Sequence, residues 1–207
     1  MINRLLTILV AFGFILQVDA DNHENGGSTI MTKEEVESTL EQGLNNLASG
    51  RSVSDIVMRH IDVGAEHMGV SVVQRSKVEP RDTESGIAHV DLDEIYYIVA
   101  GEGTMVTGGE FVDKQTSNSS LLGPMERGEI RGGVLQRVKP GDIAIIPKGM
   151  PHGWHEIETD NISYIIFRGD PNKVMDIKQE CSAETPRFIK TGIALIDLLL
   201  APIGRSN

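Results

Sequence analysis

Two short segments of the chain combine histidine, carboxylate and aromatic side chains with residues typical of β-strands. They are GIAHVDLDEIYYIVAGEG at residues 86–103 and GDIAIIPKGMPH at residues 141–152. Imidazole and carboxylate groups together suit first-row divalent metals. Because side chains alternate along a strand, Glu94 and Tyr96 are expected to share one face. His152 and Trp154 are expected to share a face in the same way.

The two segments resemble the paired motifs of the cupin superfamily. The second segment matches the pattern G-x5-P-x-G-x2-H through Gly141, Pro147, Gly149 and His152. The first segment matches the latter part of the other motif, H-x4-E-x6-G, through His89, Glu94 and Gly101. The resemblance covers about residues 55–170. It implies an all-β fold, the double-stranded β-helix or jelly-roll barrel of a single-domain cupin.

Two positions depart from the commonest cupin motifs. The first motif usually has a histidine two residues before His89, where this chain has Ile87. The second usually closes with asparagine four residues after His152, where this chain has Glu156. The resemblance therefore implies a metal site with three protein ligands instead of four, namely His89, Glu94 and His152.

Three such ligands agree with two known kinds of metal centre. Two histidines and one carboxylate with open positions form the facial triad of non-haem iron enzymes. Three protein ligands also suit catalytic zinc, which keeps one position for water or substrate. The expected cofactor is thus one divalent ion, and these ligand types do not distinguish Fe, Zn, Mn and Ni.

Tyr96 and Trp154 are expected to line a substrate pocket beside this site, with one hydroxyl and one N–H donor. Glu94 and Tyr96 are the candidate catalytic residues. Each residue also has a plainer interpretation: Glu94 as an exposed charge at a strand edge, and the aromatic rings as packing in the barrel. Asp91 lies close enough in sequence to serve as a substitute ligand. His155 has the opposite strand parity to His152 and should point outward.

Short apolar stretches broken by Gly, Pro and Asp predict the strands of the barrel. They are Ile56–Ile61, Gly69–Val73, Glu94–Ala100, Gly103–Thr107, Gly133–Val138, Asp142–Pro147 and Asn161–Arg168. Many short strands with turns between them are typical of a sandwich or barrel. The polar stretch Val112–Arg131 is expected to form a long loop or a hairpin. The Pro147 and Gly149 turn would present His152 to the interior.

An amphipathic helix is predicted before the barrel. Thr32 and Glu35 have capping-box spacing. Apolar residues then recur at helical spacing until Gly50, at Val36, Leu40, Leu44 and Leu47. After the barrel the run Ile193–Leu200 is too short to span a bilayer, so we expect it to form a terminal helix that docks on the body.

The first twenty residues are typical of a secretory signal peptide. Arg4 provides a positive start, an apolar run extends from Leu5 to Leu16, and small residues precede a cleavage point after Ala20. The expected organisation is a signal peptide at 1–20, an N-terminal extension at 21–54, the barrel at 55–170 and a C-terminal extension at 171–207. The mature protein is expected to be secreted or periplasmic and to have no stable membrane span.

Composition excludes several functions. The formal charge of the 207-residue chain is −11, and an acidic surface repels nucleic acid and anionic lipid. Removing residues 1–20 takes away Arg4 and Asp19, so the charge stays −11. Cys181 is the single cysteine, which rules out an intramolecular disulfide and any zinc site with two thiolate ligands.

These observations predict an exported, metal-binding cupin that acts on a small molecule. The resemblance implies an oxygenase-like or an isomerase/lyase activity, since cupins include both. The alternative is a non-catalytic cupin with a degenerate metal site that binds a sugar-like ligand, which the residue Ile87 favours. A homodimer is a further expectation, because cupins often dimerise.

Overall fold

The structure is a computed structural model that describes residues 28–119 and 121–178. The expected signal peptide at 1–20 and the expected terminal helix at Ile193–Leu200 lie outside the described residues. In the described part, one helix precedes ten strands. In chain order they are α1 (Lys33–Ala48), β1 (Val53–Asp62), β2 (His67–Val78), β3 (Glu84–His89), β4 (Asp93–Ala100), β5 (Gly103–Thr107), β6 (Glu110–Ser119), β7 (Gly123–Arg131), β8 (Val134–Val138), β9 (Ile143–Ile146) and β10 (His152–Asp170).

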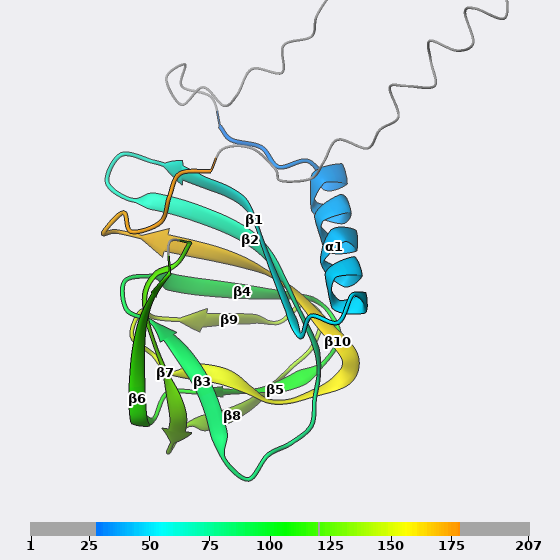
Figure 1. Cartoon of the computed structure of the whole chain (residues 1–207). Coiled ribbons are helices and arrows are strands. Elements are labelled where there is room, and N and C mark those ends of the chain that lie inside the picture. The colour runs from blue at the N-terminus through cyan, green and yellow to red at the C-terminus, as the bar shows by residue number, and fades with distance from the viewer. Residues whose placement is uncertain (1–27, 120, 179–207) are drawn as a thin grey trace, which may run out of the picture.

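The long strand β10 belongs to both layers of the barrel (Figure 1). Its second half, Asn161–Asp170, pairs with β2, and β4 lies on its other side, so the first layer runs β1-β2-β10-β4-β9. Its first half, His152–Ile157, pairs with β5, and His152 also pairs with Ile87 of β3. The second layer therefore runs β6-β7-β3-β10-β5-β8. All these pairs are antiparallel, and the predicted cupin barrel is confirmed.

Three strands of the second layer were not among the predicted strands. The polar stretch Val112–Arg131 is a hairpin of β6 and β7, one of the two expected forms. β3 pairs with β7 over its full length, from Glu84 opposite Ile130 to His89 opposite Met125. These polar sequences lack a clear apolar alternation, and their extended form depends on long-range pairing with neighbouring strands.

The core lies between the two layers and is mainly aliphatic. Its buried members are Val73, Tyr96, Ile98, Met105, Val138, Ile146, Ile157, Ile162, Tyr164 and Ile166. Along β4, buried and exposed residues alternate from Asp93 to Ile98. Glu94 therefore occupies an inward position in an otherwise apolar row with Tyr96 and Ile98, as the alternation of the sequence predicted.

The helix α1 begins with the predicted capping box. The Glu35 N–H donates to Thr32 Oγ1 at 3.2 Å, and the Thr32 N–H donates to Glu35 Oε2 at 2.9 Å. The predicted apolar stripe was partly wrong, because the fully buried residues are Thr39 and Gly43 whereas Leu44 is 42% exposed. The helix approaches β2 through Gly43, where a side chain would overlap Gln74. No helix in the described ranges combines the length and apolar character needed to cross a membrane.

Candidate metal centre

Three buried side chains from different strands meet inside the barrel. His89 ends β3, Glu94 is the second residue of β4, and His152 begins β10. Their exposed fractions are 3%, 1% and 4%. The Gly149 N–H donates to the His89 carbonyl at 2.7 Å, so the turn predicted at Pro147–Gly149 ties the start of β10 to the end of β3. Gly149 has a φ of 76°, which a residue without Cβ adopts readily.

The spacing of the three groups fits a single metal ion. His89 Nε2 lies 3.4 Å from Glu94 Oε1, and His152 Nε2 lies 3.5 Å from Glu94 Oε2. One potential ligand atom from each residue lies within 4.8 Å of the others. Metal–ligand bonds of zinc are about 2.0–2.1 Å, which at a tetrahedral angle separates two ligands by about 3.3 Å. Small adjustments would bring all three groups onto one ion.

His152 presents an unprotonated nitrogen to Glu94. Its Nδ1 lies 3.0 Å from the Met150 carbonyl oxygen, which can only accept a hydrogen bond. The proton of the neutral imidazole is therefore on Nδ1, and Nε2 carries a lone pair. Burial lowers the pKa of His152, so the ring stays neutral. A backbone carbonyl that orients a histidine in this way is typical of metal-ligating imidazoles.

His89 has a polar atom that no described residue satisfies. Its Nδ1 is buried and has no hydrogen-bond partner within residues 28–119 and 121–178. Burial lowers the pKa of His89 to about 4, so this ring is also neutral near pH 7. Two neutral imidazoles that face one ionised carboxylate form a donor set that suits a divalent cation.

Glu94 accepts hydrogen bonds from two donors. Arg168 Nε donates to Oε1 at 2.9 Å, and the Tyr96 hydroxyl donates to Oε2 at 2.9 Å. Burial is the largest influence and would raise the pKa of Glu94, but the charge and hydrogen bond of Arg168 and the two neighbouring histidines together outweigh it and lower this pKa to about 2. The carboxylate is therefore ionised, and the plain interpretation of Glu94 as an exposed edge charge is wrong.

Arg168 is the residue of the site that the sequence interpretation missed. It donates to Ser71 Oγ at 2.7 Å and to Asp55 Oδ2 at 2.9 Å in addition to Glu94. Burial opposes its charge, but Asp55 and Glu94 raise its pKa above the usual value. The sequence did contain a signal for it. Arg168 follows Ile162, Tyr164 and Ile166 at alternate positions of one strand, which places a cation on the same inward face as three apolar residues.

The fixed charges of this network leave room for a cation. Asp55 and Glu94 carry two negative charges and Arg168 carries one positive charge, while both histidines are neutral. Counted over these five side chains, of which Asp55 is only partly buried, the network has a formal charge of −1 before any ion binds. Asp55 Oδ1 is buried and has no hydrogen-bond partner among the described residues. A divalent ion would reverse this net charge without adding a protein group.

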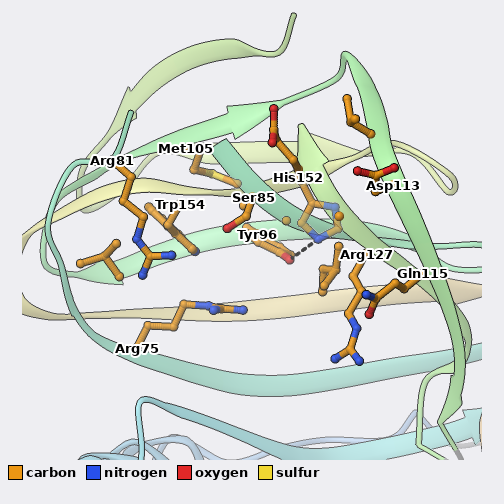
Figure 2. Close-up of a pocket in the computed structure, with 17 residues that line it drawn as sticks. Arg75, Arg81, Ser85, Tyr96, Met105, Asp113, Gln115, Arg127, His152 and Trp154 are labelled. Atoms are coloured by element: carbon orange, nitrogen blue, oxygen red, sulfur yellow. Dashed lines mark hydrogen bonds between the residues drawn. The ribbon is translucent and has the colours of Figure 1, made fainter. Parts of the chain in front are cut away.

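A cavity of about 600 Å³ adjoins the centre (Figure 2). The predicted pocket residues Tyr96 and Trp154 both line it, together with His152. The Tyr96 oxygen lies 3.2 Å from His152 Nε2, the contact that is dashed in Figure 2. Burial raises the pKa of Tyr96, so the phenol stays protonated. Ile87, at the position of the missing histidine, also lines the cavity.

Other residues considered from the sequence lie outside the metal centre. Asp91 accepts a hydrogen bond from Asn172 Nδ2 at 2.7 Å and does not join the cluster. His155 lies 2.6 Å from Glu84 Oε1 through its Nδ1 and does not reach Glu94. Neither residue contributes a ligand in this geometry.

The fold and the paired motifs define a member of the cupin superfamily. Within it, the chain belongs to the family of AraC-like ligand-binding domains, whose sequence profile matches residues 89–206. That match begins at His89, includes both other cluster residues, and covers more than half of the chain. A search of curated proteins found no significant match.

Solved structures similar to the chain share little sequence with it. KdgF from Halomonas sp. is 16% identical, with a TM-score of 0.37, over 57% of this chain and 79% of that one. A Klebsiella pneumoniae protein with a double-stranded β-helix domain is 16% identical, with a TM-score of 0.34, over 56% and 79%. A Bacillus halodurans protein is 14% identical, with a TM-score of 0.37, over 75% and 92%.

Proposed function

We propose that the protein is an exported cupin that binds one divalent metal ion through His89, Glu94 and His152 and acts on a small molecule in the adjoining cavity. The observation that carries the proposal is the convergence of two neutral imidazoles on one buried, ionised carboxylate. The Met150 carbonyl supports it, because it leaves His152 Nε2 free to ligate. Arg168 and Tyr96 would act on the metal indirectly, by orienting Glu94.

The chain would provide binding and proton chemistry around the ion. A bound ion would supply Lewis-acid chemistry, or redox chemistry if it is iron. Tyr96 reaches the cavity wall as a protonated phenol; its proton is donated to Glu94 in this structure, so an oxygen of the bound molecule would compete with Glu94 for it. Trp154 would offer an aromatic face and an indole N–H. An oxygenase-like or isomerase/lyase reaction agrees with this set, with Glu94 and Tyr96 as the catalytic candidates.

A second candidate function is small-molecule binding without turnover. Ile87 takes the position of the usual fourth ligand and lines the cavity with an apolar side chain. Arg168 already compensates the charge of Glu94 at 2.9 Å, which allows the carboxylate to stay ionised without a metal. Under this alternative the cluster is a structural hydrogen-bond network, and the cavity alone has the functional role.

Metal analysis separates the two candidates. We would purify the protein from Asp21 onward, as wild type, His152→Ala and His155→Gln, and determine metals by mass spectrometry. His155→Gln is the matched control, since His155 lies outside the cluster. The proposal expects about one Fe, Zn, Mn or Ni per wild-type and control chain, and loss in His152→Ala. A folded wild type that none of these ions can load would refute the metal site and leave the binding function.

A further inference from the structure

The cavity beside the candidate metal centre has an arginine-rich wall. Arg75 comes from β2, Arg81 from the connection between β2 and β3, and Arg127 from β7. None of the three forms an ion pair with a carboxylate of the described residues, although each lines the same cavity. In Figure 2, Arg75 and Arg81 extend beside Trp154, and Arg127 reaches in from the other side.

Arg75 is held in position by the barrel core. It shares the inward parity of β2 with Ser71 and Val73, and its Nε donates to the Tyr164 hydroxyl at 2.9 Å. Tyr164 is 1% exposed and stacks on Tyr96 with ring centroids 4.8 Å apart. The core thus orients the guanidinium through its Nε, and the side chain is half-buried.

The terminal nitrogens of Arg75 lack acceptors within the protein. A guanidinium has five N–H donors, of which Nε uses one. The described residues provide no hydrogen-bond acceptor or ion pair for the other four. A planar fork with free donors matches the two oxygens of a carboxylate or phosphate. Arg75 is therefore oriented by the core and has free donors with which to bind an anion.

The local charge of the cavity contrasts with that of the protein. The whole chain has a formal charge of −11. Two carboxylates, Asp113 and Glu129, line the cavity with the three arginines. Glu129 also forms an ion pair with Arg131 at 3.6 Å, which offsets part of its negative charge. The three arginines outnumber the two carboxylates, so the lining has a formal charge of +1 within an acidic protein, which favours an anion in this cavity.

We propose that the cavity binds a small organic anion whose carboxylate or phosphate group is held by Arg75 and Arg81. The remaining body of the ligand would face Tyr96 and His152 across a volume of about 600 Å³, within the usual size of small-molecule sites. The part of this inference that concerns Tyr96 and His152 rests on the proposed function. The arginine anchor does not require the metal.

The single tryptophan of the chain, Trp154, lines the cavity and reports on its occupation. We would titrate the protein by tryptophan fluorescence with three anions and their neutral counterparts. The pairs are D-glucuronate with D-glucose, D-glucose 6-phosphate with D-glucose, and benzoate with benzamide. We expect at least one anion to bind, and to bind about tenfold or more tightly than its neutral counterpart. The responding pair distinguishes a carboxylate from a phosphate ligand.

Variants test whether Arg75 and Arg81 hold the anion. Arg75→Gln and Arg81→Gln are each expected to weaken binding of the anion by about tenfold or more, because a charge-assisted contact is lost. Arg137→Gln is the matched control, since Arg137 is exposed on β8 and pairs with Glu102 and Glu158. Arg81 is exposed and forms no internal hydrogen bond with described residues, so its variant should fold even if Arg75→Gln does not.

Three results would overturn the inference: no response to any of the anions, equal affinity for charged and neutral counterparts, or unchanged affinity in both cavity variants. Metal content, measured on the same samples, keeps the two proposals separate. If the protein binds an anion but cannot be loaded with metal, the arginine anion site stands and the metal site is refuted. If the protein binds metal but none of the anions, the metal site stands and the anion site is refuted.

Discussion

Glu94 is the residue on which the candidate centre depends. Its two oxygens contact His89, His152, Tyr96 and Arg168 at distances between 2.9 and 3.5 Å. Both imidazoles face it in the neutral form, while Arg168 and Tyr96 donate hydrogen bonds to it. A carboxylate with this environment is ionised and oriented, which are the two properties that a metal ligand needs.

Replacing Glu94 by glutamine tests its role as a ligand. Glu94→Gln keeps the size of the side chain but removes its negative charge, so we predict a loss of about tenfold or more in metal affinity. The measurement is a competition titration with a chromophoric chelator. Glu158→Gln, at a carboxylate that pairs with Arg137 on the surface, should leave the affinity unchanged. Equal affinities in the Glu94 variant and the wild type would show that Glu94 is a bystander.

The buried His89 should make the stability of the metal-free protein depend on pH. Its pKa falls from 6.5 to about 4 on folding, mainly through burial. The unfolded chain therefore binds the proton more tightly, and the free energy of unfolding should decrease as pH falls from about 6.5 to about 4. A shift of this size corresponds to about 3 kcal/mol. Urea titrations at several pH values, with chelator present, would measure it.

The His89→Gln variant provides the comparison. Its free energy of unfolding should change less than that of the wild type between about pH 6.5 and 4. His155→Gln, which removes a histidine outside the cluster, should retain the wild-type slope. Identical slopes for His89→Gln and the wild type would contradict the assignment of a neutral, buried His89.

At the scale of elements, the strand β10 brings the site together. It begins with His152 in one layer and carries Arg168 in the other, so a single strand links a candidate ligand to the cation that holds Glu94. β3 lies against its first residues, and Gly86 makes this close approach possible. A Cβ on Gly86 would overlap the backbone carbonyl of His152, which cannot move without shifting β10.

Gly86→Ala should therefore disturb the centre without removing any of its groups. We predict that the free energy of unfolding falls by about 1–3 kcal/mol, as in other overpacked interiors, and that metal affinity decreases as well. Ser85→Ala, at the exposed neighbouring position, should change stability by less than about 0.5 kcal/mol. Wild-type stability and affinity in Gly86→Ala would contradict the account of this contact.

The sequence predicted the strands and residues that carry their own local pattern. The alternation along β4 placed Glu94 and Tyr96 on one face, and the motif spacing pointed to His89 and His152. Arg168 was missed because its partners, Ser71 and Asp55, lie 97 and 113 residues away along the chain. The contact face of α1 was misplaced for a related reason, because it depends on Gln74 of a later strand.

At the level of the whole molecule, neither the net charge nor the predicted export signal determines what the site binds. The chain is acidic overall, yet its cavity is lined by three arginines. The overall acidity therefore gives no information about the ligand, and the absence of nucleic-acid or anionic-membrane partners stays an expectation from the net charge. Export depends on residues 1–20, which lie outside the described residues and stay a prediction from sequence alone.

Expression of the full chain in a secreting bacterial host tests export. We predict that the exported fraction begins at Asp21, because the signal peptide is removed after Ala20. Mass spectrometry of the N-terminal peptide would show this directly. Leu9→Arg, which interrupts the apolar run of the predicted signal, should hold the protein in the cytoplasm with residues 1–20 attached. Full-length wild-type protein confined to the cytoplasm would contradict the prediction.

Anomalous diffraction from crystals of the metal-loaded protein would show whether His89, Glu94 and His152 hold the ion. Data collected at the absorption edge of the loaded metal would locate the ion independently of any activity. We predict one anomalous peak at about 2.0–2.2 Å from His89 Nε2, His152 Nε2 and a Glu94 oxygen. A peak elsewhere, or crystals in which these three side chains contact one another with no ion between them, would contradict it.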